Sequence, residues 1–423
     1  MGSAFVTMGP TNALPALLSL LLALLTCRLL SRHAGHDCAA GGVAAARYGP
    51  IDGLRGYLAL GVFLSHGCLW YFYLRSGVWV VPPSHFYTHL GESGVALFFM
   101  ITGFLFFSKL LEARDGRPLD WTRLWVSRCL RLAPAYGLAI SLVFVIVAFR
   151  SHGALHESTP LLAKQVVEWL AFTMLGGPDI NGVAQTAVIM SGVTWSLPYE
   201  WWFYLSLPLL SICLRLTPPV TCVVIGAACS LAFDWLRPNF YHVLAFGGGI
   251  AAAFAVRSPS LCRLASGRAA SCVILTILGT VVAAWPGARS VPVLLLLSVA
   301  FVLIACGNDV FGLLRQPAAL LLGEMAYSIY LLHGILLYVL FEYVLGAPAA
   351  RLSPLAHWLT VVAITPVLVC ASHAVFSFIE KPAMSRVSGV TVAVAAALTR
   401  IRRSPALVTD RGWSWPRRRR RWA

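Results

Sequence analysis

The chain has 423 residues, of which 59% are hydrophobic and only 11% are charged, and its mean hydropathy is +0.78. A soluble domain carries about 25% charged residues, so this composition argues against a soluble protein and indicates a polytopic membrane protein. The net charge of +16 does not indicate nucleic acid binding, because excess Arg and Lys in cytoplasmic loops accounts for it. The eleven cysteines lie mostly in apolar segments and are expected to be core residues rather than a disulfide framework.

Ten apolar segments follow residue 50, each close to the roughly 20 residues that a helix needs to cross a bilayer. We therefore expect an all-α polytopic membrane protein built as a ten-helix transmembrane bundle. The predicted spans lie near 52–74, 94–111, 132–149, 197–214, 219–236, 240–256, 270–285, 291–306, 323–345 and 355–379.

Three regions of different composition are expected. Residues 1–46 form an N-terminal extension whose hydrophobic segment 14–30 is an extra span, a signal-like segment or an interfacial helix. Residues 47–385 form the ten-span domain, and the basic tail 386–423 is expected to be disordered. The polar-apolar pattern of 161–175 predicts a helix along the outer interface.

The distribution of basic residues predicts the orientation. If the chain before residue 52 is cytoplasmic, 26 of the 32 Arg and Lys residues fall on the inner side. Because cytoplasmic loops carry the excess of Arg and Lys, both ends of the ten-span core are expected to be cytoplasmic.

The first span carries two residues that are costly in hydrocarbon, Arg55 and His66, within IDGLRGYLALGVFLSHG. Eleven residues make three helical turns with about 20° left over, so the two side chains share one face about 16 Å apart along the axis. Asp52 lies on the same side and could orient the guanidinium group. One ligand with a charged end and a reactive end could touch both; the plain alternative is a snorkelling arginine and a histidine bonded between helices.

Two arginines, Arg128 and Arg131, lie three residues apart in SRCLRLAPAY and share a helical face at the predicted inner surface. This pattern suits phosphate groups, but taken alone it is more typical of membrane anchoring. His85 and His89 could bind a metal only with a third ligand, so no metal site is predicted.

Two later spans carry further polar groups. Glu200 opens the apolar segment TWSLPYEWWFYL near the predicted outer interface, where Trp195 is typical of an aromatic belt. Tyr327, Tyr330 and His333 recur at a spacing of three in LGEMAYSIYLLHG. The plain alternative for these three is a polar seam that holds the helix in the bundle.

Taken together, six segments resemble the acyltransferase-3 family of membrane O-acyltransferases, in order, over residues 47–385. They are IDGLRGYLALGVFLSHG, GVALFFMITGFLF, SRCLRLAPAY, TWSLPYEWWFYL, LGEMAYSIYLLHG and FIEKPA. The sequence differs from the usual pattern at Ala326, where serine is common.

The resemblance implies transfer of an acyl group, often acetyl, from acyl-coenzyme A to a hydroxyl of a sugar, a cell-surface polysaccharide or lipopolysaccharide precursor, or a glycosylated small molecule, at a bacterial inner membrane. It implies no metal and no nucleic acid partner. His66, Arg55 and Glu200 are the predicted catalytic residues. The predicted donor-binding residues are Arg55, Arg128 and Arg131, and the predicted acceptor-binding residues are Trp195, Glu200, Tyr327, Tyr330 and His333. Direct attack with His66 as general base and an acyl-His66 intermediate both remain open.

The competing function is a transporter or flippase of lipid-linked sugars, because intramembrane His and Glu residues also suit transport. A third alternative is an inactive scaffold, which the presence of both Arg55 and His66 disfavours.

Overall fold

The computed structural model describes residues 9–33, 49–235 and 238–403. Regular structure in these ranges is helical, and the strand-like pairing found there is an isolated bridge between Ile180 and Val183. The longer helices are α1 (Leu14–His33), α3 (Gly49–Ser76), α4 (His85–Arg114), α5 (Trp121–Arg150), α6 (Thr159–Leu170), α7 (Leu197–Cys213), α8 (Val220–Trp235), α9 (Phe240–Ala255), α11 (Arg268–Ala284), α12 (Val291–Ala305), α14 (Ala326–Tyr338), α15 (Pro354–Val375) and α17 (Val387–Arg403). Shorter elements are η2 (Thr186–Met190), η3 (Val193–Ser196), α10 (Pro259–Ala265), η4 (Leu313–Arg315), α13 (Pro317–Glu324), η5 (Val339–Val344), η6 (Ala347–Arg351), η7 (Phe376–Glu380) and α16 (Lys381–Ser385).

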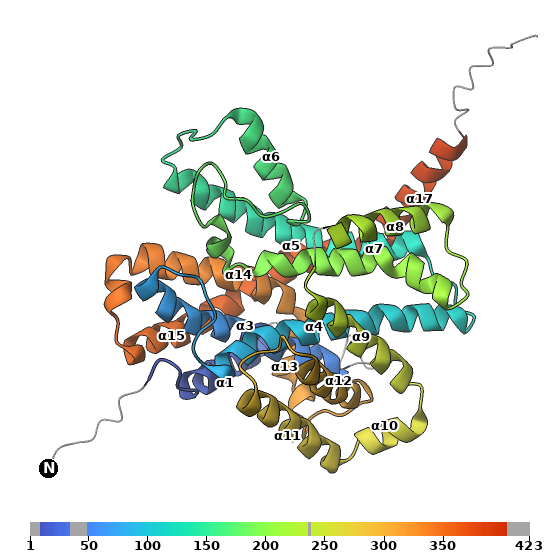
Figure 1. The fold of residues 1–423 in the computed structure, drawn as a ribbon, viewed down its shortest axis with the longest axis horizontal. Coiled ribbons are helices and arrows are strands. Elements are labelled where there is room, and N and C mark those ends of the chain that lie inside the picture. The colour runs from blue at the N-terminus through green and yellow to red at the C-terminus, as the bar shows by residue number, and fades with distance from the viewer. Residues whose placement is uncertain (1–8, 34–48, 236–237, 404–423) are drawn as a thin grey trace, which may run out of the picture.

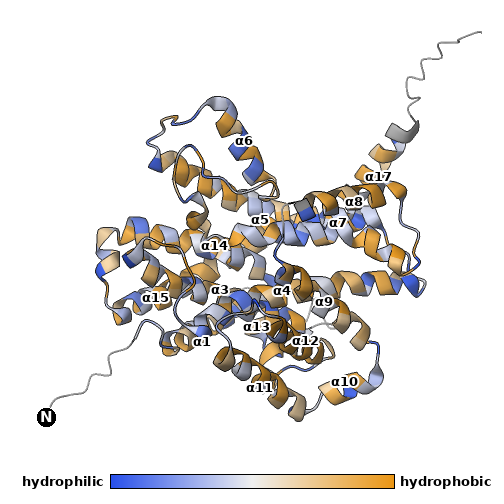
Figure 2. Ribbon diagram, viewed as in Figure 1, coloured by the Kyte–Doolittle hydropathy of each residue, from blue (hydrophilic) through white to orange (hydrophobic). Residues whose placement is uncertain are grey.

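The all-helical, multi-pass prediction is confirmed, but the count of ten spans is not. Every predicted span corresponds to a helix, yet several of these helices have only 15 to 17 residues. Among the described residues, six helices are long and apolar enough to cross a membrane, or seven if the bent pair α9–α10 counts as one span. Hydrophobicity therefore located the helices, whereas it overestimated how many of them reach full membrane length. Figure 2 shows the apolar residues along the helices and the polar ones concentrated in loops and at helix ends.

Local sequence signals explain where several helices begin. Ser84 caps α4 by accepting a hydrogen bond from the Tyr87 backbone N–H, and Asp120 caps α5 through the Arg123 N–H. The 109° bend between α9 and α10 has a similar cause, because Ser258 caps α10 and Pro259 stands in its first turn.

The central helix α4 packs against α3 on one side and α9 on the other, and α14 packs against α3 and α15 (Figure 1). The contact between α4 and α9 is very close at Gly103 and Gly249. A Cβ atom on either residue would overlap a backbone atom of the other helix, at the Phe246 and Met100 carbonyl groups respectively. Small residues that let two backbones approach are typical of helix packing in membranes.

The two terminal regions are helical where the structure describes them. Segment 14–30 lies within α1, which packs against α15 and α13 and is among the six candidate spans. Of the predicted tail, residues 387–403 form α17, which packs against α5. This helix follows from an amphipathic apolar pattern that the basic composition of the tail obscured; residues 404–423 lie outside the described residues. The predicted interfacial helix is shorter than expected, since α6 ends at Leu170 and a turn follows.

Candidate active site

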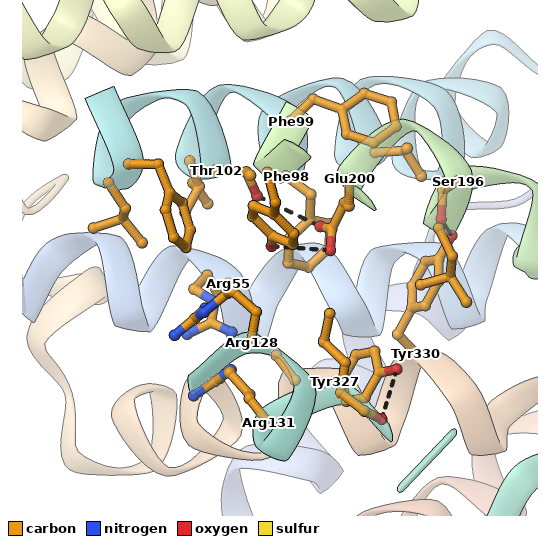
Figure 3. A pocket seen from close by; sticks show the side chains of 18 residues that line it. Arg55, Phe98, Phe99, Thr102, Arg128, Arg131, Ser196, Glu200, Tyr327 and Tyr330 are labelled. Atoms are coloured by element: carbon orange, nitrogen blue, oxygen red, sulfur yellow. Dashed lines mark hydrogen bonds between the residues drawn. The ribbon is translucent and has the colours of Figure 1, made fainter. Parts of the chain in front are cut away.

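A cavity of about 190 Å³ lies among α3, α4, α5, α7 and α14. Its walls are mostly apolar and aromatic, but they also carry three arginines and one carboxylate. Figure 3 shows the side chains of Arg55, Arg128 and Arg131 gathered on one side of this cavity, and Ser196 and Tyr330 at the opposite side. The volume is below the roughly 300–1,000 Å³ of a typical site for a whole drug-sized ligand, so the cavity would admit one arm of a larger molecule.

The three arginines come from two helices, α3 and α5, that are not consecutive in the chain. Arg55 lies on α3, with only 18% of its side chain exposed, and its Nη1 lies 3.7 Å from Asp52 Oδ1. Arg128 lies on α5, where its guanidinium carbon is 4.9 Å from the centre of the Phe106 ring, and its Nε is buried with no hydrogen-bond partner among the described residues. Arg131, one turn further along α5, donates to the Met384 sulfur, a weak acceptor, at 3.5 Å. The cavity therefore holds more guanidinium donors than protein acceptors, as an anion-binding site would.

Glu200 supplies the carboxylate of the cavity. It lies in the first turn of α7, where Pro198 precedes it and where the helix dipole favours a negative charge. Its oxygens accept hydrogen bonds from the Thr102 hydroxyl at 3.4 Å and from the Tyr204 hydroxyl at 3.3 Å (Figure 3). Glu200 also interacts electrostatically with Arg55, so it balances part of the arginine charge.

Tyr327 and Tyr330 line the cavity from α14 and are fixed by hydrogen bonds to backbone. The Tyr327 hydroxyl donates to the Leu132 carbonyl at 3.2 Å, and the Tyr330 hydroxyl lies 3.1 Å from the Val193 carbonyl and 2.8 Å from Ser196 Oγ. The Tyr330 ring also contacts the His333 ring, with centroids 6.1 Å apart. Tyr330 thus connects the cavity to the second polar group of the bundle.

That second group is a pair of histidines from α3 and α14. His66 Nδ1 and His333 Nε2 are 3.1 Å apart, and the two rings are stacked. His333 is fully buried, and its Nδ1 lies 3.0 Å from the Ile329 carbonyl. A carbonyl only accepts, so His333 Nδ1 carries the proton, and its neutral Nε2 accepts from His66 Nδ1–H. This chain of donors leaves the lone pair on His66 Nε2, the arrangement that a general base requires.

The structure thus brings eight of the nine predicted site residues into two adjoining groups and leaves one outside. Arg55 lines the cavity and His66 does not, although both lie on α3 as predicted. Trp195 is 40% exposed and packs against the His242 ring at a centroid distance of 4.6 Å, away from the cavity.

Sequence reasoning missed several neighbours of these groups. Thr102 and Tyr204 hold Glu200, yet an isolated threonine or tyrosine in an apolar helix carries no distinctive signal. Glu380 is fully buried and accepts a hydrogen bond from the Ser328 hydroxyl. The proline of FIEKPA does not end the helix, because proline is tolerated in the first turn of α16 and the chain stays helical through Pro382. The available signal in the sequence was an acidic residue close to a proline at the end of an apolar segment.

Among the described residues, no group of three or more His, Cys, Asp or Glu side chains could hold a metal ion. His89 instead lies on α4 and bonds to Ser93 Oγ at 2.8 Å and to the Trp285 carbonyl at 2.9 Å.

Comparison with known proteins gives one match. The acyltransferase-3 family model, described as an acyltransferase domain, matches residues 49–375, which is more than half of the chain. No curated protein and no solved structure matches it.

Proposed function

The chain belongs to the acyltransferase-3 family, and on that premise we propose that it transfers an acyl group, most simply acetyl, from acyl-coenzyme A to a hydroxyl of a sugar or glycan. The observation that carries the proposal is that Arg55, Arg128 and Arg131 line one cavity beside the helix that carries His66.

The arginine side of the cavity is the proposed site for the donor's phosphates. Guanidinium groups bind phosphate oxygens through paired, charge-assisted hydrogen bonds, and here the buried Arg128 Nε lacks a protein acceptor. The cavity has room for the narrow acyl-pantetheine arm, and the bulky nucleotide would remain at the mouth. Along α3, Arg55 and His66 are separated by about 16 Å of helix rise, a distance that such an arm can bridge.

The proposed reaction uses His66 as the general base. His66 Nε2 accepts the proton of the acceptor hydroxyl as its oxygen attacks the thioester carbonyl carbon. The carbon–sulfur bond then breaks, and the coenzyme A thiolate leaves with the proton that His66 held. His333 keeps His66 in the required tautomer through the 3.1 Å hydrogen bond, and it is itself fixed by the Ile329 carbonyl.

The remaining residues support binding. Glu200, held by Thr102 and Tyr204, limits the net positive charge of the cavity, and Asp52 positions Arg55. Tyr330 lines the cavity and its ring contacts His333, and its hydroxyl would serve the developing oxyanion only by exchanging its bond to the Val193 carbonyl.

The test compares cells that lack the chain with cells complemented by the wild type or by His66→Ala. Mass spectrometry of surface glycans and secreted metabolites should show one class of molecule that loses an acyl mass without the chain. The wild type should restore this mass and His66→Ala should not. Restoration by His66→Ala would contradict the proposed base, and altered location of a glycan with no change in mass would favour a transporter.

A further inference from the structure

The loop that joins α3 to α4, residues 77–84, covers the histidine pair, and it is called the Trp79 loop below. The Trp79 ring stacks on His66, with centroids 6.1 Å apart and planes 16° apart. The same ring packs edge-on against Tyr73 at 5.1 Å and Trp70 at 5.6 Å. His66, which remains partly exposed, is therefore flanked by His333 on one side and Trp79 on another.

Two side chains hold the Trp79 loop on the bundle, the partly buried Trp79 and the buried Pro82. The neighbouring Val78, Val80 and Val81 are each more than half exposed, whereas Trp79 turns inward. Within the described chain, the hydrogen bonds of the loop lie at its two ends. At one end the Gly77 N–H donates to the Tyr73 carbonyl and Ser76 Oγ bonds to Val78, and at the other the Ser84 N–H and the Thr88 hydroxyl donate to the Pro82 carbonyl. A loop held by few contacts opens at low free energy, so the ring contacts of Trp79 decide how often His66 is covered.

The surroundings of Trp79 carry unused hydrogen-bonding groups. Trp70 Nε1 and Ser191 Oγ are buried, and neither has a partner among the described residues. Ser191 adopts a left-handed backbone conformation, with φ of 52°, and its backbone touches α14 at Gly334, the residue after His333. Strained residues and unsatisfied buried polar groups cluster at functional sites more often than elsewhere.

The donor cavity cannot supply the acceptor's route, because His66 does not line it. An acceptor hydroxyl must nevertheless reach His66 Nε2 for the proposed reaction. Of the two rings that contact His66, Trp79 is the one that an acceptor can displace, because Trp79 lies in a loop and His333 lies in a buried helix.

We propose that the Trp79 loop is the gate of the acceptor site, and that a ring-shaped polyol of the pyranose class takes the place of the Trp79 indole beside His66. A pyranose has an apolar C–H face that packs on aromatic rings such as Trp70 and Tyr73. Its hydroxyl edge can bond to groups such as Trp70 Nε1 and Ser191 Oγ. The nature of the acceptor rests on the proposed function, whereas the gating of His66 does not.

The gate is tested without any acceptor by measuring access to position 66. In His66→Cys protein, purified in detergent, a membrane-impermeant methanethiosulfonate reagent is added, and labelling of that cysteine is followed by peptide mass spectrometry. Fragment ions separate it from Cys68, which is fully buried. Adding Trp79→Ala should accelerate labelling about tenfold, because it removes the ring contacts that hold the closed state. Val80→Ala, at an exposed position of the same loop, should leave the rate unchanged, and Trp79→Phe should keep it close to the parent rate. Equal rates with Trp79 and with Trp79→Ala would overturn the gate.

A second measurement connects the gate to the acceptor. With acetyl-coenzyme A alone, Trp79→Ala should raise the release of coenzyme A several-fold, because water then reaches His66 as a substitute acceptor. The double variant with His66→Ala should lose this increase. Faster labelling without faster hydrolysis would keep the gate and contradict His66 as the base, so failure of the gate and failure of the proposed function are distinguishable.

For the acceptor class, methyl α-D-glucopyranoside should slow labelling of the parent His66→Cys protein, and glycerol at equal concentration should not. Equal effects of the two compounds would overturn the assignment to a ring-shaped acceptor.

Discussion

The arginine side of the cavity and the histidine pair are two polar regions that share helix α3. They differ in how many of their hydrogen-bonding groups have partners within the protein. The arginines retain unused donors, such as the buried Arg128 Nε, and one wall carboxylate offsets only part of their charge. The histidines are satisfied internally by a hydrogen-bond chain that ends at the Ile329 carbonyl. A site with surplus donors is suited to bind an anion, and a site with a fixed tautomer is suited to move a proton. Substitutions in the arginine region should therefore change the KM for the donor, and substitutions in the histidine pair should change kcat.

Loss of the base should have the largest effect. His66→Ala should lower transfer from labelled acetyl-coenzyme A by about 10²–10⁴-fold, the usual contribution of a general base. Donor binding, measured by equilibrium filtration, should stay within about twofold, because the arginine side of the cavity is intact. Loss of donor binding together with turnover would show that the two regions do not act separately.

Removal of one arginine should weaken donor binding. Arg128→Ala should raise the KM for acetyl-coenzyme A by about ten- to a hundredfold with little change in kcat, since it removes charge-assisted bonds worth about 1.5–3 kcal/mol. Arg123→Ala, an exposed arginine on the same helix, is the matched control. With acetyl-pantetheine, which has no phosphate, Arg128→Ala should make no difference; an equal loss with both donors would argue against phosphate binding.

Loss of the positioning histidine should have an intermediate effect on turnover alone. His333→Ala should lower kcat about tenfold or more at an unchanged KM for the donor, because His66 loses the acceptor that fixes its tautomer. His333→Asn, whose side-chain oxygen can accept the same bond, should recover part of the activity. A purely structural role for His333 would instead reduce the amount of folded protein and give no recovery of kcat.

The smallest effect should come from Glu380, a buried carboxylate that neighbours the arginines but does not line the cavity. Ser328→Ala removes the hydroxyl that donates to Glu380 and should destabilise the protein by about 1–3 kcal/mol. The thermal unfolding midpoint in detergent should fall, while the KM for the donor should not change. Ser385→Ala, at an exposed position, should leave the midpoint unaltered. Unchanged stability in Ser328→Ala would mean that water replaces the lost hydroxyl.

The sequence by itself determined the membrane class, the approximate place of the long helices other than α17, and the polar residues within them. These properties follow from apolar runs and helical spacing, which report what a segment must bury. The ordered motifs also identified the family, which the match over residues 49–375 confirms. The number of membrane-spanning helices could not be predicted as well, because hydrophobicity does not distinguish a helix that crosses the membrane from a shorter buried helix.

Only the tertiary structure decided which polar residues meet. His66 and His333 are 267 positions apart, and nothing in their spacing predicts a hydrogen bond between them. The same holds for Glu200, which faces Arg55 rather than His66, and for Trp79, whose loop gave no sequence signal. The physical reason is that periodicity defines the face that a helix buries, whereas the partner of that face is set by how all the helices pack together.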